Sequence, residues 1–175
     1  IGRNFTEALG KALRSLERAG ATFDWAGEPG DRDTLLTEIE RPQDGRLTIV
    51  MDAIRAGATP EQIHEHTAID PWFVDQLFLV HEVAQRVRAA ENLTPELLRL
   101  AKRHGFSDAQ IGQLRDMRED VVRGVRHALG VRPVYKTVDT CAAEFAAHTP
   151  YHYSSYDEET EVAPRERPAV LILSL

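Results

Sequence analysis

The sequence contains very little cysteine: Cys141 is the only one among 175 residues. A single cysteine cannot close a disulfide within the chain, which fits a reducing cytoplasm. Long apolar runs are also missing, because no stretch approaches the roughly 20 residues that a membrane helix needs. Neither an initiating methionine nor a signal peptide opens the chain, which begins at Ile1. We therefore expect a cytoplasmic segment cut from a longer chain, with no membrane partner.

Positive charge is in deficit as well. The 21 Lys and Arg residues face 28 Asp and Glu residues, which gives a formal net charge of −7. Nucleic-acid phosphates bind clustered cations, so this balance disfavours a nucleic-acid partner for the chain as a whole. The glycine-rich loops that cradle phosphates and the G-x-S-x-G turn of serine hydrolases are absent. We expect neither a bound cofactor nor a catalytic constellation in this chain.

Helical periodicity dominates the N-terminal part. Apolar residues recur every three or four positions from Phe5 to Leu16, which predicts a helix over 4–20 with Gly20 as its stop signal. Asp33 is the expected N-cap of a short helix over 34–39.

Apolar residues make up 42% of the chain. This is enough for one domain with a hydrophobic core, or for one domain with fragments of its neighbours.

The middle of the chain contains an internal repeat. Residues 57–77 align without a gap on residues 105–125, at an offset of 48 positions (105 − 57). In each copy a glycine suited to positive φ ends one helix, a Thr or Ser caps a short second helix, and a third helix follows. Copies of this length cannot bury an apolar face alone, so we expect the two to pack together. The matched pairs include Gly57 with Gly105, Thr59 with Ser107, Gln62 with Gln110, and Ile63 with Ile111.

Two further helix starts and a change of pattern complete the fold prediction. A longer helix begins at Pro71 and another at Pro95, each directly after an Asp or Thr that can cap it. After Gly130 the pattern becomes irregular, with one short helix over 140–147, and the apolar run 169–175 resembles a buried strand. We predict an all-α bundle of short helices with an internal helix-turn-helix-like repeat, an irregular C-terminal segment, and a terminal strand stub of the next domain.

Cys141 raises the question of a catalytic nucleophile. Such a cysteine needs a base within hydrogen-bond reach, and His148 follows about two helical turns later. Small residues flank Cys141, however, which is typical of close helix packing, where a free cysteine behaves as a small hydrophobe. We favour the structural interpretation over the catalytic one.

The histidines and acidic residues do not favour a metal site. His64 and His66 are two positions apart, so they point to different faces of a helix, and the H-E-x-x-H spacing of zinc enzymes is absent. His81 and His104 stand alone on predicted helices. We interpret the acids of 157–161 as a solvated face or a partner for basic residues, and we expect no metal ligand.

The second repeat copy leaves one alternative function, a helix-turn-helix that binds nucleic acid. Residues 107–136 contain six cations against four acids, a local balance of +2. The matching helix of the first copy is apolar and acidic, so we interpret the repeat as packing architecture and keep nucleic-acid binding as the alternative. The six cations are Arg115, Arg118, Arg123, Arg126, Arg132 and Lys136.

Several stretches carry a resemblance to a known family. "PVYKTVDTCAAEF" (133–145), with Tyr-rich and acidic residues after it, resembles the middle of the large chain of carbamoyl-phosphate synthase. "IGRNFTEALGKALRSLE" (1–17) looks like the helix that closes the first synthetase half of such chains. "IDPWF" (69–73) and "GFSDAQI" (105–111) are similar to the helical region between the halves, and "RPAVLIL" (167–173) to the first strand of the second half.

The resemblance implies a segment of a multidomain ligase. The family makes carbamoyl phosphate, for arginine and pyrimidine biosynthesis, from bicarbonate, ATP and ammonia that a separate small subunit releases from glutamine. Its two ATP-grasp halves use ATP with Mg²⁺ or Mn²⁺, and these sites lie outside this segment, which itself would hold no cofactor. The helical region between the halves, the oligomerisation domain, joins them and contacts other large chains.

The resemblance also implies a division of the chain and its partners. Residues 1–20 would close the first ATP-grasp half, 21–164 would form the helical domain, and 165–175 would begin the second half. The implied partners are the two flanking halves, other large chains and the small glutaminase subunit. We expect the helix 141–145 to seat against a neighbouring half, and Lys136 and Glu144 to form buried or interdomain ion pairs, which are costly to break singly. The structural and interdomain candidates are Lys136, Asp139 (as an N-cap), Cys141, Glu144 and Phe145.

Overall fold

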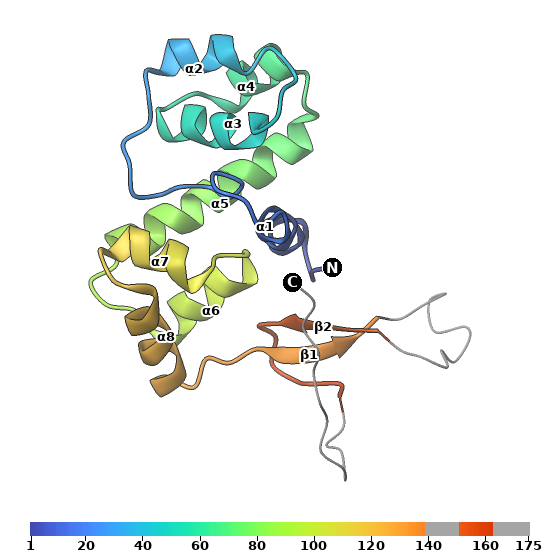
Figure 1. The fold of residues 1–175 in the computed structure, drawn as a ribbon, viewed down its shortest axis with the longest axis vertical. Helices are drawn as coiled ribbons and strands as arrows, with labels where there is room; N and C mark the ends of the chain where they lie inside the picture. Colours follow the sequence, from blue (N-terminus) through green and yellow to red (C-terminus); the bar gives the residue numbers. More distant parts are fainter. Residues whose placement is uncertain (139–150, 163–175) are drawn as a thin grey trace. The chain divides into compact units, whose positions relative to one another are not determined.

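The computed structural model describes residues 1–138 and 151–162, and this part of the chain is mostly helical (Figure 1). The chain divides into two compact units, Ile1–Arg132 and Pro133–Leu175. All the described helices lie in the first unit. Because the described part of the chain is mostly helical, the all-α prediction is confirmed. They are α1 (Phe5–Ser15), α2 (Arg32–Glu38), α3 (Arg46–Arg55), α4 (Pro60–Thr67), α5 (Pro71–Ala89), α6 (Pro95–Arg103), α7 (Asp108–Arg115) and α8 (Glu119–Ala128).

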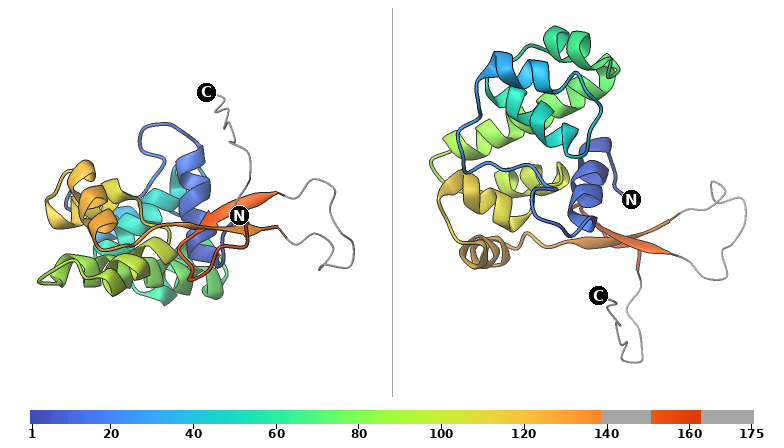
Figure 2. Two further views of the ribbon diagram at one scale, coloured as in Figure 1. Left: turned by 90° about the horizontal axis from the view of Figure 1, so that it is seen from below. Right: turned by 45° about the horizontal axis from the view of Figure 1, so that its top comes forward.

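The first unit is built around α5, which has 19 residues. This helix packs against α1, α3, α4, α6 and α7. In Figure 1 it crosses the unit obliquely, between the α2–α4 group and the α6–α8 group, and the right-hand view in Figure 2 shows the same separation. Because α5 is the third helix of the first repeat copy and packs against the second, the expectation that the two copies pack together is confirmed.

The local geometry of the repeat is the same in both copies. Thr59 Oγ1 accepts a hydrogen bond from the Gln62 backbone N–H at 3.3 Å, and Gln62 Oε1 accepts one from the Thr59 N–H at 3.0 Å. The equivalent distances in the Ser107–Gln110 capping box are 3.1 Å and 3.0 Å. The left-handed positions also recur 48 residues apart: Gly57 and Gly105 have φ of +91° and +86°, and Ala68 and Asp116 have φ of +54° and +51°. The capping prediction is therefore confirmed for both copies.

Two predicted helix boundaries were wrong. The first helix ends at Ser15 rather than near Gly20, because Glu17 already adopts a left-handed conformation with φ of +49°. The second helix is capped by Asp31, whose Oδ2 accepts from the Thr34 N–H at 3.0 Å, rather than by Asp33. Asp33 lies in the first turn, where a carboxylate favours the helix dipole, so both acids suit a helix start and the pattern does not separate them.

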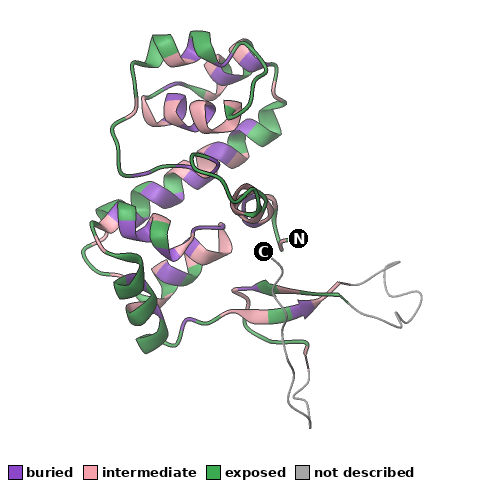
Figure 3. Ribbon diagram, in the orientation of Figure 1, coloured by how far each residue is buried: buried purple, intermediate pink, exposed green. Residues whose placement is uncertain are grey.

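Part of the core comes from the connection between α1 and α2, which shows no helical periodicity. Phe23 and Trp25 are 5% and 1% exposed, and Trp25 stacks on Phe106 with ring centroids 5.7 Å apart. Figure 3 shows buried residues along α3, α5 and the inward sides of α6 and α7. The largest fully buried side chains are Trp25, Ile39, Met51, Ile63, Leu77, Leu98, Ile111 and the valines at 50, 74, 83, 87 and 122.

The described part of the second unit contains a pair of antiparallel strands, β1 (Val134–Thr137) and β2 (His152–Ser155). Lys136 pairs with Tyr153, and Val134 with Ser155. These strands fall in a segment that we predicted to be irregular, because neither four-residue stretch shows an alternation of apolar and polar residues. The expected helix over 140–147 and the expected strand over 169–175 lie outside the described residues.

Candidate functional site

Of the predicted site residues, the structure describes Lys136. This side chain lies on β1 and is 9% exposed, and its Nζ forms an ion pair with Glu161 Oε1 at 3.2 Å. Glu161 Oε2 also accepts from the Thr137 N–H at 2.9 Å, so this acid joins the edge of β1 to the residues after β2. Asp139, Cys141, Glu144, Phe145 and the possible base His148 lie outside the described residues.

The histidines of the first copy serve different elements. His64 Nδ1 lies 2.7 Å from the Ile69 carbonyl oxygen, and His66 Nδ1 lies 3.0 Å from Glu40 Oε1. The two rings therefore face different partners, as their spacing predicted. No group of three His, Cys, Asp or Glu side chains among residues 1–138 and 151–162 is placed to hold a metal ion.

His104 lies in a polar contact between α1 and the end of α6. Its Nδ1 is 2.9 Å from Thr6 Oγ1, and the Thr6 hydroxyl donates to Asn4 Oδ1 at 2.8 Å. Because that hydroxyl proton is already used, His104 must donate from Nδ1. Burial, and then the charge of Arg86, lower the pKa of His104, which keeps the ring neutral at physiological pH.

A close backbone contact holds α1 to the turn between α6 and α7. A Cβ at Gly10 would lie 2.7 Å from the Gly105 carbonyl oxygen, and a Cβ at Gly105 would lie 2.7 Å from the Thr6 carbonyl oxygen. Arg14 Nη1 donates to the Gly105 carbonyl at 2.5 Å, and Asn4 Nδ2 donates to the Arg103 carbonyl at 3.1 Å. Helix α1 is therefore an integral part of the helical unit.

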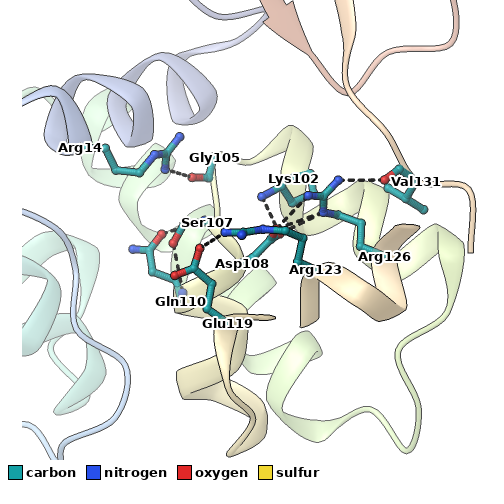
Figure 4. A network of polar contacts seen from close by, with 10 residues as sticks. All are labelled: Arg14, Lys102, Gly105, Ser107, Asp108, Gln110, Glu119, Arg123, Arg126 and Val131. Atoms are coloured by element: carbon teal, nitrogen blue, oxygen red, sulfur yellow. Dashed lines mark hydrogen bonds and ion pairs between the residues drawn. The ribbon is translucent and has the colours of Figure 1, made fainter. Parts of the chain in front are cut away.

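The centre of the second copy is a buried ion cluster around Asp108 (Figure 4). Arg126 binds this carboxylate with two groups, Nε to Oδ1 at 3.0 Å and Nη2 to Oδ2 at 2.8 Å. Lys102 Nζ lies 3.0 Å from Oδ1, and Arg123 Nε lies 3.8 Å from Oδ2. Arg126 Nη1 also donates to the Val131 carbonyl at 3.0 Å. The cluster thus connects α6, α7 and α8 to the chain segment that leaves α8.

The electrostatics of the cluster follow from burial and charge together. Asp108 and Arg126 are each 6% exposed. Burial acts to raise the pKa of Asp108, but the hydrogen bond from Arg126 and the charge of Lys102 outweigh it, so its pKa lies below the ordinary value. Burial also lowers the pKa of Lys102, and Asp108 opposes that shift. The carboxylate is therefore ionised at neutral pH.

The same contacts test the nucleic-acid alternative. Arg126 points into the core, and the neighbouring Arg118 and Arg123 pair with the acids Asp120 and Glu119 of their own helix. Nothing in the described part of the chain supports a surface for phosphates on α8, and the alternative has no support from the geometry.

Arg115, another of the six cations, also has a structural role. Its guanidinium donates to backbone carbonyls at the C-terminal end of α5 and just beyond it. Carbonyls at a helix end have no partner within the helix, so a cation at this position stabilises them. The acceptors are Val87 at 3.3 Å, Arg88 at 3.0 Å, Ala90, and Glu91 at 3.1 Å.

Sequence reasoning missed the cluster, although the repeat contained a signal for it. When the offset of 48 residues is extended just beyond the aligned copies, it places Ile54, Pro60 and Phe78 opposite Lys102, Asp108 and Arg126. Positions that are apolar in one copy of a packed repeat are expected to be buried in the other. Opposite charges at three such positions therefore indicate a buried ion cluster, whereas a count of charges alone suggests a basic surface.

Among the described helices, none combines the length and apolar character needed to cross a membrane.

Comparison with known proteins identifies the family. Residues 1–130 match the family described as the carbamoyl-phosphate synthetase large chain, oligomerisation domain. Proteins called carbamoyl phosphate synthase large chain are 72% identical in Kineococcus radiotolerans and Streptomyces avermitilis, and 69% identical in Streptomyces coelicolor, over 99% of this chain. The chain spans 16% of the length of these relatives. It therefore belongs to the family of the carbamoyl-phosphate synthetase large-chain oligomerisation domain.

Proposed function

We propose that this chain is a non-catalytic helical module that mediates contacts between large chains and connects the two synthetase halves of one large chain. The observation that carries the proposal is the match of residues 1–130 to a family defined as an oligomerisation domain. The matched range agrees closely with the first compact unit, Ile1–Arg132.

The parent protein is proposed to be a carbamoyl-phosphate synthase large chain. In this proposal it makes carbamoyl phosphate from bicarbonate, ATP and ammonia, which a small glutaminase subunit supplies. ATP and Mg²⁺ or Mn²⁺ would bind in the flanking synthetase halves. We keep the division implied by the resemblance as a proposal: 1–20 closes the first half while α1 packs on the helical unit, 21–164 forms the helical domain, and 165–175 begins the second half.

The segment around Cys141 is proposed to seat the module against a neighbouring half. In this proposal Asp139 caps the helix that carries Cys141 and Phe145, and Lys136 and Glu144 contribute ion pairs. A small buried cysteine tolerates alanine but not a bulky side chain, because added volume forces packed neighbours apart. A nucleophile would tolerate neither.

In the full-length enzyme, Cys141→Ala is therefore expected to retain ammonia-dependent carbamoyl phosphate synthesis, whereas Cys141→Leu is expected to reduce it. The measurement is the steady-state rate with ammonia as nitrogen donor, together with the molar mass of the assembly. A complete loss of activity in Cys141→Ala with an unchanged assembly would show that the thiol takes part in chemistry.

Self-association of the 175-residue chain tests the oligomerisation part of the proposal. Light scattering on a sizing column is expected to give at least twice the 19.7 kDa mass of one chain, and this mass should persist over a wide dilution range. Specific interfaces of ordinary size resist dilution, whereas adhesion through small exposed patches does not. A mass of one chain at every concentration would restrict the module to connecting the synthetase halves.

A further inference from the structure

Three aromatic side chains form an exposed patch on the first unit, where the N-terminal ends of α1 and α5 meet. Phe5 lies against Trp72 and Phe73, with ring centroids 5.5 Å and 5.3 Å apart, and the rings of Trp72 and Phe73 are 5.0 Å apart. Trp72 is 53% exposed and Phe73 is 44% exposed. We call Phe5, Trp72 and Phe73 the aromatic patch.

The position of the patch in the repeat indicates that it has a purpose beyond the unit's own core. Trp72 corresponds to Asp120 of the second copy, which pairs at the surface with Arg118. Phe73 corresponds to Val121, a smaller residue that is similarly exposed. The first turn of α5 therefore presents two large aromatic rings where the same turn of α8 presents a polar pair and a valine. Contiguous exposed aromatic rings are unfavourable in water and are typical of contact sites.

The chain that enters α1 passes close to this patch. Ile1 lies four positions before Phe5, so the start of the chain lies within about 14 Å of the patch. Helix α1 cannot swing away freely, because Gly10 and Gly105 are in backbone contact and Asn4 donates to the Arg103 carbonyl. Any polypeptide joined to Ile1 therefore starts beside the aromatic patch.

The size of the patch favours a tethered partner over a separate chain. A fully buried Trp or Phe covers about 150–250 Å², so two half-exposed rings and the partly exposed Phe5 offer roughly 300 Å². A stable dimer buries about 800 Å² on each partner, so the patch does not make up such an interface by itself. A tethered partner needs far less area, because the tether supplies a local concentration in the millimolar range.

We propose that the aromatic patch is the docking surface for the part of the same large chain that precedes Ile1, and that this part covers Trp72 and Phe73 with an apolar surface of its own. The inference rests on the proposed function, in that this chain is one segment of a longer large chain. The relatives support it, since the chain spans only 16% of their length. The contact joins domains within one chain and is separate from the surface that joins different chains.

Hydroxyl-radical footprinting of the full-length large chain tests the inference. Oxidation of Trp72 is compared with that of Trp25, which is 1% exposed, at a concentration where the protein assembles and at one where it does not. At both concentrations, Trp72 in the folded protein is expected to react at least about tenfold more slowly than Trp72 in the unfolded chain. Trp25 is expected to show the same protection. Fast oxidation of Trp72 at both would overturn the inference, and protection only in the assembled protein would assign the patch to a second copy.

A variant separates this inference from the proposed self-association. Full-length Trp72→Ser is expected to assemble to the same mass in light scattering, because the patch lies outside the contact between chains. The backbone amides in the first turns of α1 and α5 are expected to exchange with solvent several-fold faster than in the unsubstituted chain. If the variant fails to assemble, the inference is contradicted, but the proposal that the module joins large chains still holds. If the unmodified full-length chain never assembles, that proposal is contradicted, but the expected protection of Trp72 is not.

Discussion

Replacement of Asp108 by asparagine is expected to lower the free energy of unfolding of the helical unit by about 3–5 kcal/mol. Asparagine keeps the shape of the side chain but removes the charge that Arg126 and Lys102 both contact inside the protein. Burial of cations without this anion is unfavourable, and a typical domain is stable by only about 5–15 kcal/mol. Urea unfolding followed by circular dichroism measures the loss as a lower midpoint with an unchanged slope.

A second variant distinguishes the charge effect from lost packing. At the equivalent positions 48 residues earlier the chain has Ile54, Pro60 and Phe78, so apolar side chains are compatible with these positions of the architecture. The triple variant Lys102→Met, Asp108→Leu, Arg126→Met is expected to be more stable than Asp108→Asn, because it removes all three charges together. If Asp108→Asn costs less than about 1 kcal/mol, the cluster is not a determinant of stability.

The pH dependence is a further readout of the same substitution. The folded-state pKa of Asp108 lies below its ordinary value of 3.8, because its hydrogen bonds and neighbouring cations outweigh its burial. A lowered carboxyl pKa contributes stability above the unfolded-state pKa and loses it as the pH falls through the folded-state pKa. Stability should therefore decrease below about pH 4, and more steeply in the parent sequence than in Asp108→Asn.

The parts of the fold that depend on short sequence spacing were predictable. A capping box needs only residues three positions apart, so the spacing alone is enough to place Thr59–Gln62 and Ser107–Gln110 at helix starts. The offset of 48 residues then extended these local assignments to the whole repeat. Packing of the copies followed because neither has enough apolar surface to be stable alone.

The parts that depend on contacts between distant residues were not predictable in the same way. Asp108 and Arg126 are 18 residues apart, and the sequence does not show whether their charges face water or each other. Trp25 lies in a segment without periodicity, so nothing marks its stacking on Phe106. The strands β1 and β2 are four residues each, too short for an alternation to stand out. The predicted residues Asp139, Cys141, Glu144 and Phe145 stay predictions, since they lie outside the described part of the chain.

Substitution of Gly105 by alanine is the second change with a large expected effect, about 3 kcal/mol of lost stability. Gly105 has φ of +86°, a conformation that costs an alanine about 1–2 kcal/mol. The added Cβ would also lie 2.7 Å from the Thr6 carbonyl oxygen, so α1 has to move. Overpacking of this kind costs about 1–3 kcal/mol. The two costs add because one concerns the local backbone and the other the contact with α1.

The repeat supplies the matched control for this prediction. Gly57 is the equivalent residue of the first copy, with φ of +91° and no atom within 4 Å of an added Cβ. Gly57→Ala therefore carries the conformational cost alone, about 1–2 kcal/mol, and the difference between the variants measures the contact with α1. Hydrogen exchange should show faster opening of residues 5–15 in Gly105→Ala but not in Gly57→Ala. Equal losses of stability at the two glycines would mean that α1 does not depend on close contact with the turn, and that the helical unit can release its first helix without penalty.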